Sequence, residues 1–569
     1  MHPSTLAKRG TVLLFLVIIA VYFFGLGRLP LVGPDEPRYA EVAREMFMRH
    51  DFVSPTLGGH LWFEKPALVY WMMIASFKLF GVTEWAARLP AAISGLLTIL
   101  AVFVMGRRIE RGGAADENQS YAFWAALAAA TMIGIAAFSR AASFDIVLTM
   151  TTTWMLAFFV LADPDQNFAG ASETNTKLCN WFLAGFYIFI GLSLLAKGLV
   201  GIVVPAGVLG FYYLFQRRLP GRKLLTSLIW GLPLALMVAA TWYAPVWRRH
   251  GWLFIDQFFI QHHFARYISN KYHHSQPVYY YLLVLPLLAL PWTAFFVDGL
   301  LQSRSWFVRV RERRSSRGEA GLRQLMILAL AWLLFPLLFF SFSNSKLPGY
   351  ILPILPATAL IVGERLLRLY QYVKTDKTAE AGEWPIGATA ILFLLFGAGV
   401  LVYSMMTGVV PRGSAALVAA TLFVVSIVAL LFRRSSRLTA LLSFPVSTIA
   451  LLIVSLYWLA PAFADGDSSK RLLQLADARG YAQTDIFGMQ RSDRTPEFYA
   501  MGRIAYGVDG EPIMYESPKQ VIDESARRSA ALLCFVPVGE VNLLTGSDAA
   551  RSEVIGNNGR YAVVAVRAR

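Results

Sequence analysis

Long apolar runs, separated by short polar segments, fill the first four fifths of this 569-residue chain. Most runs are uncharged over about 17 to 24 residues, enough for a helix to cross the hydrocarbon core of a bilayer. Strands of a membrane barrel would instead alternate in polarity over about 10 residues. The pattern predicts a polytopic α-helical membrane protein with about 13 spans. The predicted spans are 11–27, 89–106, 121–138, 146–162, 181–196, 198–215, 224–247, 278–297, 324–343, 350–367, 385–407, 414–432 and 438–461.

Basic residues in the connections predict how these spans are oriented. The most basic connections are Arg107–Arg111, 217–223, 302–323 and Arg433–Arg437. Lysine and arginine are enriched in cytoplasmic loops, and Lys8 and Arg9 precede the first span. An odd number of spans that starts from a cytoplasmic N-terminus therefore places all four connections inside and the end of the chain outside.

One further apolar stretch, 66–81, would reverse this parity if it also crossed the membrane. It has only about 16 residues, short of the roughly 20 that a span needs, and it contains Lys78. Counting it as a span would move all four basic connections to the outer face. We therefore predict that 66–81 is an interfacial helix within an outer loop, 28–88.

The composition changes after residue 461. Residues 462–569 have mixed charge and short β-like runs such as ALLCFVPV and RYAVVAV. The chain should therefore divide into a transmembrane domain, 1–461, and a small outer α/β domain, 462–569.

Composition and charge exclude several classes of protein. Hydrophobic residues make up 56% of the chain and charged residues only 15%, whereas soluble proteins have about 25% charged residues. The net charge of +16 gathers in short loops between apolar runs, so we expect no nucleic-acid partner. Cys179 and Cys534 lie far apart in sequence, which predicts neither a disulfide framework nor a thiolate zinc site.

Acidic and basic residues gather where the predicted spans meet the outer face. Asp35 lies in the run GPDEPRYAEVAREM, in an N-cap position with Pro37 in the first turn of a helix. A helix cap is therefore one explanation of Asp35, and solvated loop surface is one explanation of most outer arginines. Asp35 and Asp145 each adjoin a hydrophobic segment, where an ionised carboxylate needs a partner, so both are candidate functional residues.

Six short motifs carry these charged residues at predicted outer positions. They are DEPRYAE at 35–41, FEKP at 63–66, SFD at 143–145, AKG at 196–198, HFAR at 263–266 and SKLPGYIL at 345–352. In this order they resemble the motifs of the lipid A aminoarabinose transferases. That family belongs to the GT-C class of polyprenyl-phosphate-sugar-dependent glycosyltransferases, which includes the related protein O-mannosyltransferases. The family often has threonine where Pro37 stands here, and this difference leaves the sugar open.

The resemblance implies a fold, a location and a reaction. The fold would be a GT-C-type transmembrane bundle with periplasmic interfacial helices, in the bacterial inner membrane. The reaction would be inverting transfer of 4-amino-4-deoxy-L-arabinose from undecaprenyl phosphate to a lipid A phosphate at the periplasmic face. The partners would be the lipid-linked donor, lipid A and membrane lipids. Lower negative charge on lipid A would give resistance to polymyxin and other cationic peptides.

The resemblance also implies roles for individual residues. Those expected in catalysis are Asp35, Asp145 and Arg38. Those expected to bind the donor phosphate are Lys65, Arg266, Tyr350 and Lys346. Those expected to position the sugar or the loop are Glu36, Tyr39 and Lys197. Glu64 and His263 are candidate ligands of a divalent metal ion, the only cofactor considered, but two ligands make a weak site.

Two alternatives remain open from the sequence. One is a transferase with another sugar or a hydroxyl acceptor, in which Asp35 would have to act as a base. The other is a transporter or flippase of lipid-linked sugars. Transporters place ionisable residues near the middle of the membrane, whereas here acids and bases gather at the outer ends of the spans. This distribution favours an enzyme that works at one face.

Overall fold

A computed structural model describes residues 15–110, 120–168, 176–265, 276–307, 317–375, 383–464, 466–490 and 494–569. The chain divides into two compact units. The helical unit consists of Met1–Phe24, Glu64–Val69 and Pro90–Val454. The α/β unit consists of Gly25–Phe63, Tyr70–Leu89 and Ser455–Arg569. Residues that follow the first predicted span therefore belong to the same unit as the C-terminal residues.

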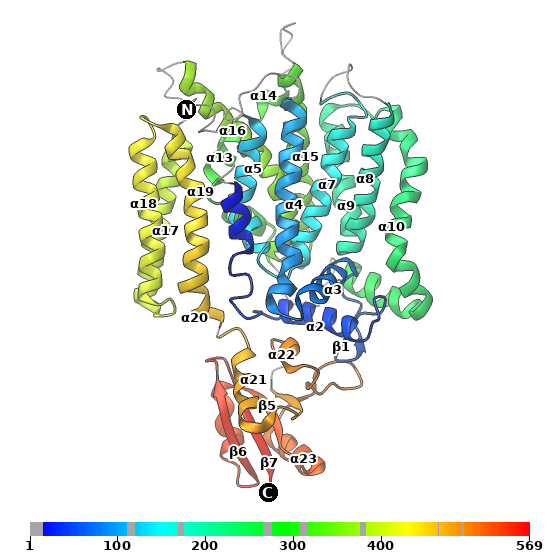
Figure 1. Cartoon of the computed structure of the whole chain (residues 1–569), viewed down its shortest axis with the longest axis vertical. Coiled ribbons are helices and arrows are strands. Elements are labelled where there is room, and N and C mark those ends of the chain that lie inside the picture. The colour runs from blue at the N-terminus through cyan, green and yellow to red at the C-terminus, as the bar shows by residue number, and fades with distance from the viewer. Residues whose placement is uncertain are drawn as a thin grey trace. The chain divides into compact units, whose positions relative to one another are not determined.

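The helical unit is a bundle of long apolar helices, most of which run side by side (Figure 1). Its helices are α4 (Glu84–Glu110, from Pro90 onward), α5 (Tyr121–Thr131), α6 (Ile133–Phe138), α7 (Phe144–Ala162), α8 (Thr176–Lys197), α9 (Val200–Gln216), α10 (Arg222–Phe254), α12 (Tyr280–Leu288), α13 (Thr293–Leu301), α14 (Arg304–Phe307), α15 (Arg317–Ser341), α16 (Leu355–Thr375), α17 (Trp384–Thr407), α18 (Arg412–Phe432) and α19 (Arg437–Val454), with the 3₁₀ helix η3 (Pro348–Ile354) before α16.

The chain is a multi-span membrane protein. Among the described residues, nine helices are long and apolar enough to cross a membrane, and a tenth candidate is the pair α12 and α13, bent by 117°. The shorter apolar helices α5 and α9 coincide with two more predicted spans. Residues 15–23, which are helical, coincide with the first. Each predicted span thus has a helix, and the count of thirteen crossings stays a prediction.

Two predicted spans, 121–138 and 278–297, are broken, which the apolar pattern did not indicate. The second consists of the bent pair α12 and α13. α5 ends at Thr131 and α6 begins at Ile133, because Met132 between them has an extended backbone. Trp292 Nε1 donates to Thr131 Oγ1 at 2.9 Å, and the Ile133 amide donates to the Leu290 carbonyl at 2.9 Å. Neutral groups from neighbouring segments therefore satisfy polar groups at the break, as a membrane interior requires.

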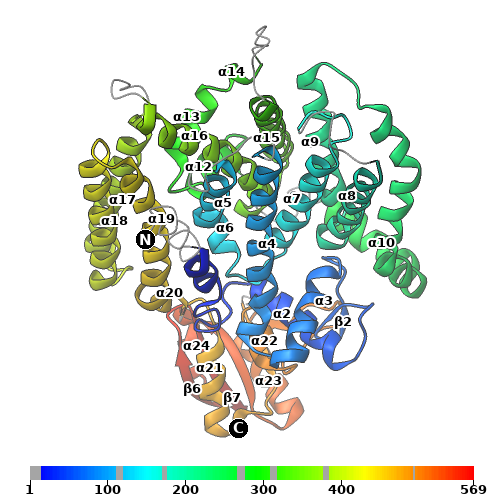
Figure 2. The same ribbon diagram turned by 45° about the horizontal axis from the view of Figure 1, so that its top comes forward.

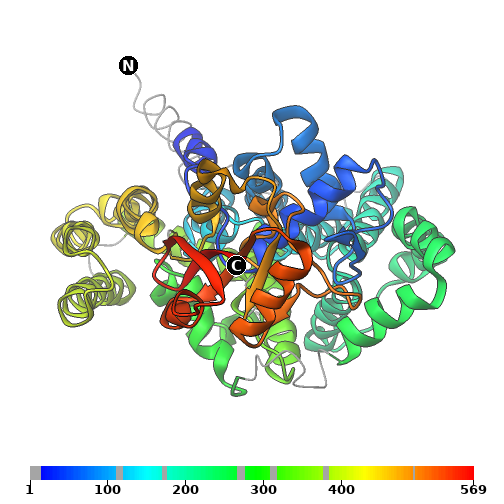
Figure 3. The same cartoon turned by 90° about the horizontal axis from the view of Figure 1, so that it is seen from below.

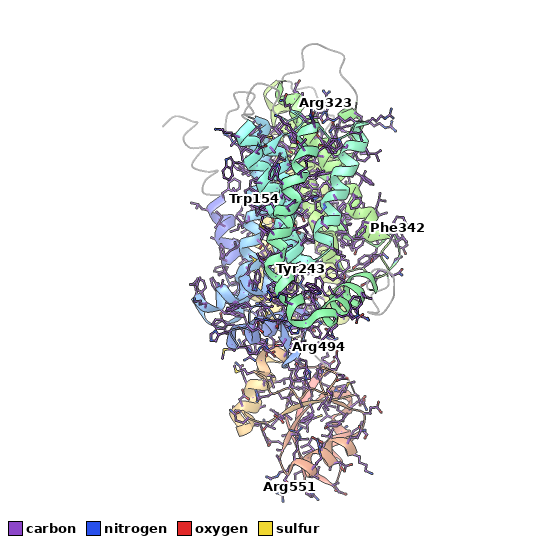
Figure 4. All side chains as sticks on the ribbon, turned by 90° about the vertical axis from the view of Figure 1, so that its right-hand side faces the viewer. Trp154, Tyr243, Arg323, Phe342, Arg494 and Arg551 are labelled. Atoms are coloured by element: carbon purple, nitrogen blue, oxygen red, sulfur yellow. The ribbon has the colours of Figure 1, made fainter. Side chains whose placement is uncertain are left out.

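Two sets of helices lie at opposite edges of the helical unit (Figure 2). One set contains α17, α18 and α19, and the other contains α8, α9 and α10. Tyr243 of α10 donates its hydroxyl to the Leu194 carbonyl of α8 at 3.0 Å (Figure 4). α10 continues to Phe254 through a non-helical Gly251, and a π-helix, η2, follows from Ile255 to Ala265. The predicted span ended at residue 247, so the helical structure of residues 248–265 was not predicted.

The basic connections gather at one end of the helical unit. Figure 1 shows the turn between α18 and α19 at the same end as α14, and the turn between α17 and α18 at the other. α9 separates Lys197 from Arg217 by 17 helical residues, a rise of about 26 Å. Lys197, at the end of α8, and the basic residues that follow α9 therefore lie at opposite ends of α9.

The α/β unit begins with α2 (Asp35–Met48), a hairpin of β1 (Thr56–Leu57) and β2 (His60–Leu61), and α3 (Leu68–Phe80), of which Tyr70–Phe80 belongs here. α3 has 13 residues and a length of about 20 Å, too short for a hydrocarbon core of about 30 Å. This length supports an interfacial helix. Glu45 of α2 accepts from the Gly58 amide at 2.6 Å and so ties the hairpin turn to the helix.

The C-terminal part of the α/β unit, orange to red in Figure 3, contains a five-stranded sheet. The strand order is β4-β3-β5-β7-β6. Its elements are α21 (Lys470–Ala476), β3 (Ile486–Met489), α22 (Glu497–Ala500), β4 (Met514–Tyr515), α23 (Pro518–Arg528), β5 (Leu532–Pro537), α24 (Val541–Thr545), β6 (Ala550–Asn557) and β7 (Tyr561–Ala568). β3 pairs in parallel with β4 and β5, while β7 is antiparallel to β5 and β6. The β-like runs of the sequence are β5 and β7.

Candidate functional site

Asp35 is the first residue of α2 and does not cap it. The N-cap is Pro34, and no side chain makes a capping hydrogen bond there, so the predicted N-cap position of Asp35 was wrong by one residue. The Asp35 side chain is 55% exposed and forms an ion pair with Arg38, one helical turn further on. Helix capping therefore does not explain this exposed carboxylate beside a hydrophobic segment, and Asp35 stays a candidate functional residue.

Two aromatic rings lie near Arg38, the partner of Asp35. Its guanidinium lies 5.3 Å from the ring centroid of Tyr39 and 5.6 Å from that of Trp62. Tyr39 is buried, at 7% exposure. The flat, weakly hydrated guanidinium suits stacking on such rings, which hold it next to the carboxylate. The predicted group Asp35, Arg38 and Tyr39 is therefore brought together within the α/β unit.

Glu36 forms a buried ion pair with Arg88 that was not predicted from the sequence. Its two carboxylate oxygens accept from Arg88 at 2.9 and 2.7 Å, and one of them also accepts from the Val32 amide at 3.0 Å. The side chains of Glu36 and Arg88 are 8% and 5% exposed. Glu36 is therefore engaged in holding the loop before α2. Glu36 was predicted to position the sugar or the loop, and its contacts support only the positioning of the loop.

Two further acids of the α/β unit are buried near Arg38. Burial raises the pKa of Glu41 to about 7 although Arg44 donates two hydrogen bonds to it at 2.7 and 2.6 Å. Burial likewise raises the pKa of Glu497 in α22 to about 7, against the opposing effects of Arg494 and Arg38. Arg494, labelled in Figure 4, donates to Glu497 at 2.9 Å. Residues of the C-terminal part thus contribute charge around α2.

The helical unit brings together three further predicted residues. Lys197, the last residue of α8, forms an ion pair with Asp145, near the start of α7, and both side chains are mostly buried, at 15% and 19% exposure. The Lys197 ammonium lies 4.7 Å from the ring centroid of Tyr350 in η3. α8 ends there because Gly198 has a positive φ and begins the tight turn to α9. An acid, a cation and a phenol therefore share one end of the bundle.

The close approach of η3 to Asp145 depends on Gly349. A methyl group at this position would lie 2.0 Å from a carboxylate oxygen of Asp145, so only glycine fits without a shift. Ser143 caps α7 by accepting from the Asp145 amide at 3.1 Å. The motifs SFD, AKG and SKLPGYIL are thus one cluster in space, which explains why each combines a small or capping residue with a charged or aromatic one.

Lys346 has partners different from those predicted for it. Its ammonium donates to the carbonyls of Gln276 and Ser343 at 2.8 and 2.6 Å, and the residue is only 5% exposed. Partial removal from water lowers its pKa. Lys346 therefore joins the segment before η3 to the segment before α12. Its geometry is that of a structural tie and gives no support to a role in binding phosphate.

Glu64 and Lys65 form an ion pair at 2.8 Å in the non-helical segment that precedes α3. Their side chains are 6% and 12% exposed. The described part of the chain contains no group of three His, Cys, Asp or Glu side chains that could hold a metal ion. The predicted pairing of Glu64 with His263 has no geometry to test it, because the side chain of His263 in η2 lies outside the described residues, as does Arg266.

Comparisons with known proteins agree with the motifs. Residues 64–247 match the family model described as dolichyl-phosphate-mannose-protein mannosyltransferase. The undecaprenyl phosphate-alpha-4-amino-4-deoxy-L-arabinose arabinosyl transferase of Pseudomonas aeruginosa (strain UCBPP-PA14) is 32% identical over 366 residues, 64% of this chain. The enzyme of that name from Erwinia tasmaniensis is 29% identical over 386 residues. The chain spans about three fifths, 61% and 63%, of the lengths of these two relatives.

The solved structure of ArnT from Cupriavidus metallidurans bound to undecaprenyl phosphate superposes with a TM-score of 0.76 and 24% identity, covering 98% of both chains. The chain has the fold of ArnT. The apo ArnT structure gives a TM-score of 0.75 with the same coverage. The ArnT fold thus extends over both units, whereas the alignment with the curated relatives covers about two thirds of the chain. The curated names are those of the family to which the six motifs pointed.

Proposed function

We propose that this protein is a glycosyltransferase that moves 4-amino-4-deoxy-L-arabinose from undecaprenyl phosphate to a phosphate of lipid A. The observation that carries the proposal is the full-length fold similarity to a protein solved with undecaprenyl phosphate bound. The 32% identity to an aminoarabinose transferase supports the choice of sugar. The site would lie at the periplasmic face of a bacterial inner membrane. A lipid A molecule with less negative charge would attract polymyxin less strongly.

The proposed reaction is a direct displacement at the anomeric carbon of the sugar. An oxygen of the lipid A phosphate attacks this carbon, and the bond to the donor phosphate oxygen breaks with inversion. The electron pair of that bond leaves with undecaprenyl phosphate. The attacking oxygen is already ionised at neutral pH, so no general base is required. The demands on the protein are therefore to position the two lipids and to stabilise developing charge.

The charged residues of the motifs suit these demands. We assign Asp35 to stabilise positive charge that develops on the sugar ring or to orient its amine, with Arg38 holding the carboxylate. We assign Lys65 and Arg266 to the leaving phosphate, because charge-assisted hydrogen bonds replace the water that it loses. Lys197 and Tyr350 provide a second cation and a hydroxyl donor. The ion pair with Asp145 holds the Lys197 ammonium in place, so the two residues act together.

A transfer assay tests the proposal. Purified protein in nanodiscs is incubated with undecaprenyl phosphate-aminoarabinose and lipid A, and the lipids are analysed by mass spectrometry. We expect lipid A to gain one aminopentose while free undecaprenyl phosphate accumulates in equal amount. A lipid A that stays unmodified with the donor intact would overturn the proposal. Transfer to a hydroxyl acceptor instead would move the protein to the protein O-mannosyltransferase type of reaction.

Donor binding gives a separate prediction. Lys65→Ala should weaken binding of undecaprenyl phosphate by at least about tenfold, since hydrogen bonds to charged groups contribute roughly 1.5–3 kcal/mol. Arg266→Lys should weaken it as well, because an ammonium cannot bind two phosphate oxygens as a planar fork does. Lys78→Ala is the control for general attraction to lipid headgroups. Equal affinity in all three variants and the wild type would rule out a phosphate site at Lys65 and Arg266.

The orientation of the chain gives another prediction. Val508 lies in a turn of the α/β unit and is fully exposed, and both native cysteines, Cys179 and Cys534, are buried. Val508→Cys should therefore react with a membrane-impermeant thiol reagent in intact spheroplasts. Arg434→Cys, in a basic turn at the proposed cytoplasmic end, should react only after lysis. The reverse pattern would place the α/β unit in the cytoplasm.

A further inference from the structure

The five residues Leu29–Gly33, just before α2, have several backbone hydrogen bonds to groups outside the segment. Pro30 has no N–H, and the amides of Leu31, Val32 and Gly33 all donate to groups outside the segment. Leu31 donates to the Tyr499 hydroxyl at 2.7 Å, Val32 to Glu36 at 3.0 Å and Gly33 to the Asp467 carbonyl at 3.3 Å. The non-repetitive backbone before α2 is thus fixed by Glu36 in the first turn of the helix and by two residues distant in sequence, Asp467 and Tyr499.

Arg88 binds backbone carbonyl groups of the same segment. Its guanidinium donates to the carbonyls of Leu26, Leu29 and Pro30 at 3.1, 2.7 and 2.7 Å, in addition to the two bonds to Glu36. All three guanidinium nitrogens are therefore used, and the side chain is only 5% exposed. Lysine has three donors on a point charge and could not reproduce this planar arrangement.

Tyr499 links the segment to the C-terminal part of the α/β unit. Its hydroxyl accepts from Leu31 and donates to Glu84 at 3.2 Å, and Glu84 forms an ion pair with Lys470. Leu31 is completely buried, so its amide has no access to water if this hydroxyl is lost. Glu84 and Arg88 lie one helical turn apart at the start of α4. This turn therefore binds carbonyl groups of the segment through Arg88 and an amide group through Glu84 and Tyr499.

We propose that Arg88 and Tyr499 are positioning residues for Asp35. They fix Leu29–Gly33, and this segment sets where α2 begins and hence where the Asp35 carboxylate lies. Neither residue would touch substrate. The C-terminal part of the α/β unit thereby becomes a required component of the transferase. The inference rests on the proposed function of Asp35, because its carboxylate must be held in place to stabilise the charge of the transition state.

Two conservative variants test the inference. Tyr499→Phe removes only the hydroxyl, and Arg88→Lys keeps the charge but loses the fork. In both we expect kcat to fall about 10- to 100-fold, as small misplacements of reacting groups do, with unchanged affinity for undecaprenyl phosphate. Tyr481→Phe is the matched control for tyrosine, because its hydroxyl bonds Glu553 on the exposed side of the same unit. Arg365→Lys is the control for a buried arginine, because Arg365 pairs with Asp298 in the helical unit.

Hydrogen exchange separates this inference from the proposed function. The amides of Leu31, Val32 and Gly33 should exchange about tenfold faster in Tyr499→Phe and Arg88→Lys than in the wild type and in both controls. Unchanged exchange in both variants would show that Arg88 and Tyr499 do not fix Leu29–Gly33, whatever the activity of the variants. Faster exchange with wild-type kcat would overturn positioning as a requirement for transfer. Asp35→Asn, assayed beside them, reports on the proposed function alone, since it leaves Arg88 and Tyr499 untouched.

Discussion

Replacement of Asp35 by asparagine should lower the rate of sugar transfer by at least about 100-fold, the loss typical of removing one electrostatic contact made in a transition state. Asparagine has nearly the same shape, so the change removes charge and little else. The carboxylate is 55% exposed and does not cap α2. The variant should therefore fold normally, with an unchanged melting temperature in detergent and unchanged binding of undecaprenyl phosphate.

The chain offers a matched control for this experiment. Asp485 has a similar exposure, 47%, and pairs with Arg528 in the same unit, far in sequence from the motifs. Asp485→Asn should leave the rate of transfer per folded molecule at the wild-type value. If Asp35→Asn behaved like this control, Asp35 would be a surface residue, and the proposed reaction would need another group to stabilise the sugar.

The fold was predictable where one local signal determined it. Apolar runs located the helices, and the excess of arginine in alternate connections predicted that those connections lie at one end of the bundle. Figure 1 shows α14 and the turn between α18 and α19 at the same end. The break at Met132 was not predictable, because residues 121–138 are continuously apolar and the groups that satisfy the break, Trp292 and Leu290, are distant in sequence. The helical extension 248–265 was missed because arginines and histidines interrupt its apolar pattern.

The candidate site was predictable for residues that stand in motifs. The pair Asp35 and Arg38 follows from their spacing of three in a helix. Arg88 and Tyr499 could not be found in this way, since Arg88 is 52 residues from Glu36 and Tyr499 is 468 residues from Leu31. The signal for Arg88 was an arginine just before an apolar run, where an unpaired charge would be costly. Tyr499 gave no signal in the sequence.

The ion pair of Asp145 and Lys197 joins two helices that would each hold an uncompensated charge without the other. Both side chains are mostly buried at the end of the bundle, at 19% and 15% exposure, so solvent screens them only in part. Removal of one partner from a buried pair costs about 3–5 kcal/mol, and partial exposure reduces this to about 1–3 kcal/mol here. A structural and a functional role of the pair therefore predict different behaviour when both charges are removed.

Asp145→Asn and Lys197→Met should each abolish transfer and lower the melting temperature, because each leaves one charge without its partner. The double variant should recover much of the melting temperature, since neither charge remains, yet its transfer should stay at least about 100-fold below wild type. The pair Asp298 and Arg365, with 6% and 7% exposure, is the control in the same unit. Asp298→Asn should lower the melting temperature but not the rate per folded molecule. Recovery of transfer along with stability in the Asp145 and Lys197 double variant would make that pair structural.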